Sequence, residues 1–210
     1  MKAQTKKMQD AMTPETAMQV LKEGNARFQQ NAQINRKLSD QVAETSTGQF
    51  PFATVLSCID SRVPAELVFD QGIGDIFSVR IAGNFVNQDI LGSMEFASKL
   101  AGTKLIVVMG HTACGAVKGA CDDAKLGNLT SMLEKIKPAV EAVKFPEDLS
   151  LRNSSNSDFV NEVAVKNVQL TIDRILIESE VLSEMYQKNE IGIIGAMYDI
   201  SSGAVEFFDN

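Results

Sequence analysis

Short hydrophobic runs alternate with amphipathic segments along most of this chain. Runs of aliphatic and β-branched residues separated by helical segments are typical of parallel strands whose sheet is covered by helices on both faces. The runs predicted to be strands are 52–57, 76–81, 104–109 and 191–200. A further segment, 204–208, follows a Ser-Ser-Gly turn and is expected to pair back as an antiparallel edge strand.

The segments between these runs predict helices. Thr13 is a suitable N-cap and Pro14 suits the first helical position, so a helix is expected to begin there. Pro138 is expected to kink or divide the helix that contains it. Residues 31–50 and 145–157 are polar and predict irregular structure. The expected helices are 13–30, 63–71, 89–101, 115–124, 130–144 and 158–189.

Together these elements predict one α/β domain over residues 1–210. Its central sheet is expected to be mainly parallel, with about four parallel strands plus an antiparallel edge strand, and to be flanked by helices. Residues 1–50 are expected to form an N-terminal helical arm that packs on a partner subunit. A chain of 210 residues is long enough to bury a single substantial core.

The composition narrows the class of protein. A net charge of −7 and an isoelectric point near 4.8 argue against a nucleic-acid partner. No apolar run approaches the roughly 20 residues of a membrane span, and the N-terminus has no hydrophobic stretch typical of a secretory signal. Three cysteines do not form a disulfide framework. We therefore expect a cytoplasmic protein, with a periplasmic location open if a leader has been removed.

Reactive side chains cluster where two of the predicted strands end. Cys58 follows the first hydrophobic run, with Asp60 and Arg62 directly after it. His111 follows the third run, and Cys114 lies three residues further on. Ligands of open α/β sheets bind beyond the carboxyl ends of the strands. If the first and third strands are neighbours, the two cysteines and the histidine converge on one point.

Two thiolates and one imidazole are a zinc ligand set, and a catalytic zinc keeps its fourth position open. The chain has no second histidine, and Cys121 lies about two helical turns beyond Cys114. The fourth position therefore belongs to Asp60 or to water. Taken singly, each residue has a plainer interpretation. A cysteine after a strand is usually a small core residue, and Asp60 with Arg62 could form an ordinary surface ion pair.

The spacing C-x-D-x-R, followed some fifty residues later by H-x-x-C, resembles the β-class carbonic anhydrases. Four flanking segments are also similar to that family: SVRIAGN, GSMEFA, VVMGHTACGAV and AMYDISSGAVEFF. The resemblance covers roughly residues 14–208. It implies reversible hydration of carbon dioxide to bicarbonate and a proton, by attack of zinc-bound hydroxide. It also implies assembly as a homodimer or homotetramer.

The resemblance assigns roles to individual residues. It implies one Zn²⁺ per subunit, held by Cys58, His111 and Cys114, with Asp60 and Arg62 as the catalytic pair. The family's substrate-binding positions fall on Gln49, which would act across a dimer interface, and on Phe77, Ala82 and Phe96 of an apolar carbon dioxide pocket. Plant-like members usually carry valine and tyrosine at the last two positions. Ala82 and Phe96 therefore depart from the pattern, leave the pocket apolar and remove a phenol.

Some members of the family have a closed site, with the aspartate on the metal and a regulatory bicarbonate bound by Trp, Arg and Tyr. Those positions fall on Val55, Arg80 and Phe96, so only the arginine is retained. Closure would also leave Arg62, expected to be buried, without its partner, which is costly. We therefore expect the plant-like open site near neutral pH, with Asp60 as a fourth ligand only in a closed state.

Two alternatives remain open from the sequence. A hydrolase of carbon disulfide or carbonyl sulfide would use nearly the same zinc chemistry on this scaffold, and assays with both substrates would separate the two. A non-catalytic zinc or thiol regulatory module would require the metal site to be closed or the Asp60–Arg62 pair to be broken, whereas both residues are present.

Overall fold

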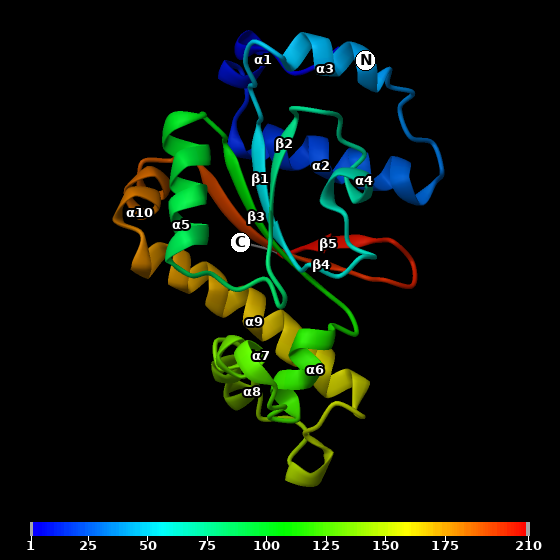
Figure 1. The fold of residues 1–210 in the computed structure, drawn as a ribbon, viewed down its shortest axis with the longest axis vertical. Coiled ribbons are helices and arrows are strands. Elements are labelled where there is room, and N and C mark those ends of the chain that lie inside the picture. Colours follow the sequence, from blue (N-terminus) through cyan, green and yellow to red (C-terminus); the bar gives the residue numbers. More distant parts are fainter. Residues whose placement is uncertain (1, 209–210) are drawn as a thin grey trace.

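The computed structural model describes residues 2–208, so residues 1, 209 and 210 of the predicted domain lie outside it. Over the described residues, five strands form one sheet in the order β2-β1-β3-β4-β5 (Figure 1). The first four are parallel, and β5 pairs antiparallel with β4, which confirms the predicted fold class. The strands are β1 Ala53–Ser57, β2 Ile76–Arg80, β3 Leu105–His111, β4 Gly192–Tyr198 and β5 Val205–Phe207.

The neighbouring positions of β1 and β3 decide where the reactive side chains meet. Ser57, the last residue of β1, pairs in register with Met109 of β3. Cys58 follows this pair on one strand, and His111 ends the other strand two residues further on. The carboxyl ends of both strands therefore reach the same edge of the sheet side by side, as the sequence interpretation required.

Helices cover both faces of the sheet (Figure 1). Alternation along β3 sends Val107 and Met109 into the core under α2 and α4, and Ile106 and Val108 into the core under α5, α9 and α10. Burial of both faces explains why the central strands are hydrophobic throughout. The covering helices are α2 Pro14–Gln29, α4 Ala65–Val68, α5 Gln88–Glu95, α9 Ser157–Glu178 and α10 Glu180–Gln187.

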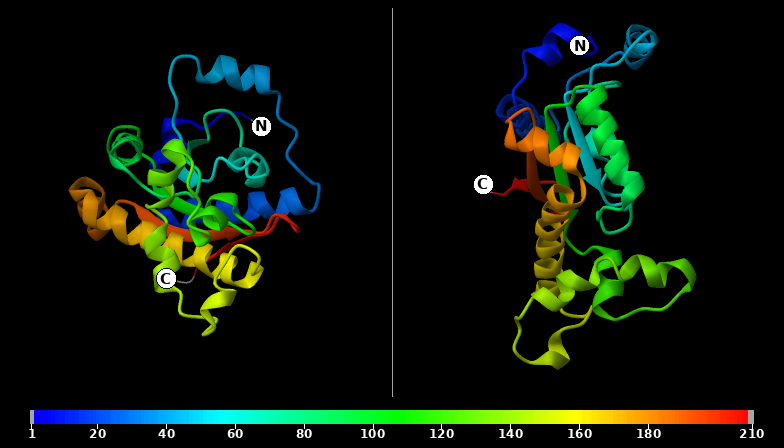
Figure 2. Two further views of the ribbon diagram at one scale, coloured as in Figure 1. Left: turned by 60° about the horizontal axis from the view of Figure 1, so that its bottom comes forward. Right: turned by 90° about the vertical axis from the view of Figure 1, so that its left-hand side faces the viewer.

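Three short helices form a lobe at the carboxyl end of the sheet (Figure 2). Their apolar residues pack against the first half of α9 and make a third core, which includes Cys58 and Cys114. The two cysteines thus lie between the sheet and the lobe, away from solvent. The lobe helices are α6 Gly115–Cys121, α7 Gly127–Leu133 and α8 Lys137–Ala142, and a 3-10 turn, η2 Leu149–Leu151, follows them.

The arm contains more helix than expected. Two short helices, α1 Lys6–Asp10 and α3 Leu38–Thr45, lie beyond the amino end of the sheet (Figure 1). The expectation that residues 31–50 are irregular is therefore wrong for α3. This helix has no side-chain N-cap and exposes Leu38 and Val42, so the sequence carries only a weak helical signal. Gln41 is its buried residue, and its side-chain oxygen accepts the backbone N–H of Ile73 at 3.2 Å.

Several predicted helices are shorter or broken. The stretch 158–189 is divided at Ser179, whose hydroxyl accepts the Leu182 N–H as the N-cap of α10. Pro138 lies in the first turn of α8 and divides the stretch 130–144, as one of the two expected outcomes. The stretch 89–101 continues from α5 into a π-helix, η1 Phe96–Leu100, and 63–71 is helical only in α4.

Within residues 2–208, no helix has the length and apolarity to cross a membrane.

Candidate metal centre

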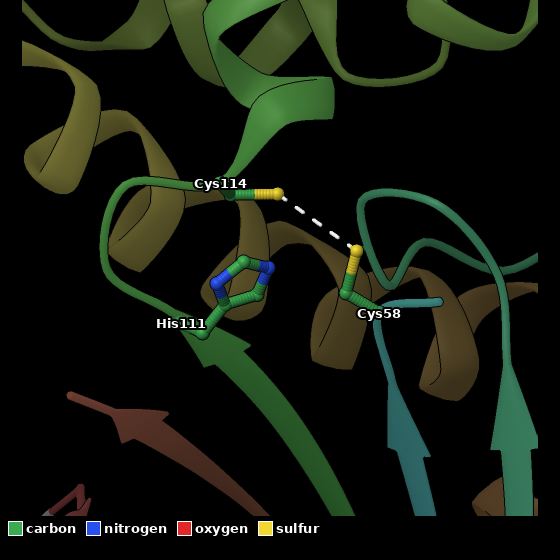
Figure 3. Close-up of side chains that lie close together, drawn as sticks. All are labelled: Cys58, His111 and Cys114. Atoms are coloured by element: carbon green, nitrogen blue, oxygen red, sulfur yellow. Dashed lines mark hydrogen bonds between the residues drawn. The ribbon is translucent and has the colours of Figure 1, made fainter. Parts of the chain in front are cut away.

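Three buried side chains bring their donor atoms to one point at the carboxyl edge of the sheet. Figure 3 shows Cys58 from the end of β1, His111 from the end of β3 and Cys114 directly before α6, all pointing toward one another. Their ligand atoms lie within 4.8 Å of one another. The two sulfurs are 4.0 Å apart. These three residues form a group that could bind a metal.

The geometry of this group fits a tetrahedral zinc. Two sulfurs bound at about 2.3 Å to such an ion lie about 3.8 Å apart, close to the separation here. The Nδ1 atom of His111 lies 3.0 Å from the Thr112 carbonyl oxygen, and this contact holds the ring proton on Nδ1. Nε2 is buried and has no hydrogen-bond partner among the residues that the structure describes. A buried lone pair beside two sulfurs matches the donors that zinc prefers.

The two thiols differ in acidity because they lie so close together. Hydrogen bonding from Cys114, assisted by the Gly83 N–H, lowers the pKa of Cys58. The adjacent Cys58 sulfur, together with burial, raises the pKa of Cys114. One thiol therefore ionises readily, while the second retains its proton against that negative charge. A divalent cation between the sulfurs would remove this repulsion and favour both thiolates.

Asp60 and Arg62 form a two-bonded ion pair beside the cluster. Arg62 donates from Nε to Asp60 Oδ1 at 2.9 Å and from a terminal nitrogen to Oδ2 at 2.7 Å. These bonds hold the pKa of Asp60 well below its usual range. The expectation that Arg62 is buried is wrong, because its side chain is 52% exposed and reaches back to Asp60 along the surface of its own loop.

The loop that carries Cys58 and Asp60 is fixed from β2. Arg80 donates from Nε to the Cys58 carbonyl at 2.9 Å and from a terminal nitrogen to the Asp60 carbonyl at 2.6 Å. Asp60 Oδ2 lies 3.9 Å from His111 Nε2, and Asp60 is not a member of the three-residue metal group. Arg80, which the sequence resemblance placed at a regulatory bicarbonate position, is thus engaged with the backbone of this loop.

The predicted substrate-binding residues are distributed less compactly. The rings of Phe77 and Phe96 meet edge to face, with their centroids 6.3 Å apart. Both rings line an open groove of about 750 Å³, which Arg80 also borders. Ala82 is half-buried in the loop after β2 and is not among the residues that line this groove. Gln49 is exposed at the opposite end of β1 from Cys58. A strand of five residues spans about 17 Å, so Gln49 does not reach the cluster of its own chain.

Two asparagines of α9 contact the loops of the metal group, and the sequence interpretation missed both. Asn167 donates its amide N–H to the Gly83 carbonyl at 2.8 Å, and Asn161 accepts the Ala113 N–H at 3.0 Å. Asn167 also has a signal in the sequence. It is polar but lies on the buried stripe of α9, between Ala164 and Val168, where an apolar residue is the usual choice.

Comparison with known proteins agrees with this geometry. The family described as carbonic anhydrase matches residues 53–205. Carbonic anhydrase 2 of Mycobacterium tuberculosis is 34% identical over 203 residues, covering 94% of each chain. The crystal structure of the β-carbonic anhydrase CafA of Aspergillus fumigatus is similar with a TM-score of 0.72 and 27% identity, covering 93% of this chain and 90% of that one. One of two tetrameric β-carbonic anhydrases of Sordaria macrospora is similar in structure with a TM-score of 0.71 and 23% identity. The match covers 93% of this chain and 98% of that one and supports the assignment of the fold.

Proposed function

The chain belongs to the β class of the carbonic anhydrases, enzymes whose general reaction is the hydration of carbon dioxide, and we propose that it performs this reaction with zinc. The products would be bicarbonate and a proton, and the reaction would be reversible. The observation that carries the proposal is the buried group of Cys58, His111 and Cys114 beside an intact Asp60–Arg62 pair. These three residues would hold one Zn²⁺ per subunit.

Zinc, when bound, lowers the pKa of a coordinated water and so supplies a nucleophile near neutral pH. Asp60 would accept a hydrogen bond from that nucleophile and orient it. Because the pKa of Asp60 is depressed, this carboxylate remains an acceptor throughout the working pH range. Arg62 holds both carboxylate oxygens, so the direction of this acceptor is fixed before substrate arrives.

We propose that carbon dioxide binds beside this pair, against Phe77, Ala82 and Phe96. The two rings meet edge to face and line one groove, and Arg80, which holds the loop of Asp60, also borders it; this supports an apolar surface on the β2 side of that loop. Gln49 would complete the site from a partner subunit, because it lies at the far end of β1 in its own chain.

The open form of the site is our proposal for neutral pH. The two-bonded pairing of Asp60 with Arg62 supports it, and so does the commitment of Arg80 to two backbone carbonyls. Because Arg62 is exposed, closure would not leave a buried charge without its partner, and that reason for an open site is weakened. The two-bonded ion pair is therefore the stronger support. Asp60 would become a fourth metal ligand only in a closed state.

We also propose one domain over residues 1–210 and self-association as a homodimer or homotetramer, in which the arm 1–50 packs on a partner subunit. Two β-carbonic anhydrases of Sordaria macrospora are tetrameric, and the arm of this chain exposes the apolar residues Leu38 and Val42. The three cysteines are free thiols, which supports a reducing, cytoplasmic compartment.

A stopped-flow hydration assay combined with metal analysis tests the proposal. The purified protein should contain zinc in proportion to its subunits, lose hydration activity when a chelator strips the metal, and regain activity on addition of Zn²⁺. Carbon disulfide and carbonyl sulfide should be assayed in parallel. Zinc-loaded protein that hydrolyses these substrates but does not hydrate carbon dioxide would replace the proposal with the hydrolase alternative.

A further inference from the structure

Helix α9 supports the metal group without supplying a ligand to it. It runs from the lobe to the sheet and contacts both β3 and β4 (Figure 1). Two loops hold the metal group: one after β1 carries Cys58, and one runs from His111 at the end of β3 to Cys114. A third loop, after β2, packs against Cys58. Asparagines of α9 bond to the backbone of the second and third of these loops.

Asn167 acts on Cys58 through Gly83. Its side chain is 3% exposed, and its only hydrogen bond that the structure records is the one it donates to the Gly83 carbonyl. The Gly83 N–H in turn donates to Cys58 Sγ at 3.4 Å. Gly83 has φ +81°, and an added Cβ would lie 2.3 Å from Ile136 Cδ1, so this backbone geometry requires glycine. The amide of Asn167 therefore fixes the residue that aims an N–H at the sulfur.

Asn161 acts on the loop between the other two donor residues. It accepts the backbone N–H of Ala113, which lies between His111 and Cys114 and directly precedes Cys114. Ala113 has φ +54°, a left-handed conformation that is unfavourable for alanine. The bond from Asn161 stabilises this conformation, which turns the chain so that Cys114 faces His111.

We propose that Asn161 and Asn167 are positioning residues that set the affinity and the electronic character of the metal site. Asn167 controls the N–H that withdraws electron density from the Cys58 sulfur, and Asn161 controls the distance between the other two donors. The two asparagines are six residues apart on one helix, so a single rigid element aligns both loops. This inference rests on the proposed function, because it takes zinc as the resident metal.

The test uses the full-length protein and the substitutions Asn167→Leu and Asn161→Leu. Leucine has a similar size, has no hydrogen-bonding group and excludes a replacing water. Two properties are measured: the rate at which Zn²⁺ transfers to a coloured chelator, and the sulfur-to-metal charge-transfer absorption of the Co²⁺-substituted protein. Asn167→Leu should shift the absorption band and speed zinc release about tenfold or more, the usual effect of losing such an outer contact. Asn161→Leu should speed zinc release to a similar degree.

Asn25→Leu is the matched control. Asn25 is 4% exposed and bridges the backbone of Val68, Gly203 and Val205 on the other face of the sheet. This substitution should lower the melting temperature but leave the cobalt spectrum and the zinc release rate unchanged.

When the wild-type protein binds the metals, three outcomes would overturn the inference. The first is wild-type behaviour of both α9 variants in both measurements, and the second is a control that changes the spectrum as Asn167→Leu does. If Asn167→Leu does not fold, Asn161→Ala is tested instead, because Asn161 is only half-buried. The third outcome is a zinc release rate of Asn161→Ala equal to that of the wild type. A wild-type protein that binds neither metal would overturn the proposed function and this inference with it. If the wild-type protein binds metal and the Asn161 and Asn167 variants have its zinc release rate and cobalt spectrum, this inference alone would be overturned.

Discussion

At the scale of single residues, the surroundings give three chemically identical thiols different properties. Burial, with a contribution from Asp122, raises the pKa of Cys121 to about 11, so that side chain remains a neutral thiol. The pKa of Cys58 is lowered by its contacts with Cys114 and the Gly83 N–H. Only the thiols that face the histidine are suited to bind a cation, because only there does a positive charge relieve an existing repulsion.

This contrast predicts the effect of removing each side chain. Substitution of Cys58, His111 or Cys114 by alanine should abolish zinc retention and hydration activity together, because three protein ligands are the minimum of a catalytic zinc site. Metal content by atomic spectroscopy and stopped-flow hydration are the measurements. Cys121→Ser is the control and should retain both metal and activity. A Cys114→Ala protein with full zinc and full activity would contradict the assignment.

At the scale of elements, a buried carboxylate ties the middle of the arm to the body of the molecule. Asp70 follows α4 and accepts hydrogen bonds from Arg27 of α2 at 2.6 Å and from Arg36 at 2.5 Å. Burial alone raises the pKa of Asp70, but the bonds from the two arginines outweigh it, and the net pKa lies below the usual value. The position of α3 therefore depends on an ion network whose two arginines precede it in the chain and whose carboxylate follows it.

Asp70→Asn should destabilise the protein by about 3 kcal/mol, because it leaves the buried Arg36 without its carboxylate. A depressed pKa means that this stabilisation is complete above the ordinary aspartate pKa of about 4 and is lost as the pH falls below it. Urea unfolding at fixed protein concentration, repeated from neutral to acid pH, measures both effects. The variant should be less stable at neutral pH and should show a shallower decline in acid.

The exposed Asp123 offers the matched control, since it also contacts two cations, Lys125 and Lys137. Asp123→Asn should cost no more than about 0.5 kcal/mol, as is usual for a surface pair. If Asp70→Asn and Asp123→Asn lower the free energy of unfolding equally, burial of the Asp70 network contributes nothing to stability.

Strand positions and the meeting of Cys58 with His111 could be predicted because they follow from local hydrophobic runs and one rule about sheet edges. The interruption at Ser179 could not, since the apolar spacing continues through it, and the break is set by a cap that also donates to Glu95 at 2.6 Å. Asn161 escaped prediction because it bonds to a backbone group, which has no signature in the sequence. Asn167 is marked as a polar residue on a buried stripe, but the sequence does not show which backbone group it bonds. Helix α3 depends on tertiary contacts of Gln41 rather than on its own pattern.

At the scale of the whole molecule, the chain has a single histidine, and it is fully buried in the metal group. Histidine is the usual proton carrier near neutral pH, so the chain has no second imidazole to move protons to solvent. The maximal turnover should therefore rise with the concentration of external buffer, while kcat/KM should not. Stopped-flow hydration at constant pH and ionic strength measures both. A kcat that is indifferent to buffer from low to high millimolar concentrations would reject this prediction.

The separation of the donor residues along the chain also sets an order of events during biosynthesis. Cys58 leaves the ribosome first and stays a solitary thiol until β2, α5 and β3 have followed it. Its partners reach it only when β3 pairs beside β1, so metal capture comes after the sheet has acquired its strand order. A chain whose strands are in the wrong order would keep Cys58 apart from His111 and Cys114 and would not bind the metal. If zinc is the resident metal, as proposed, its loading would depend on correct strand order, and only correctly folded copies would become active.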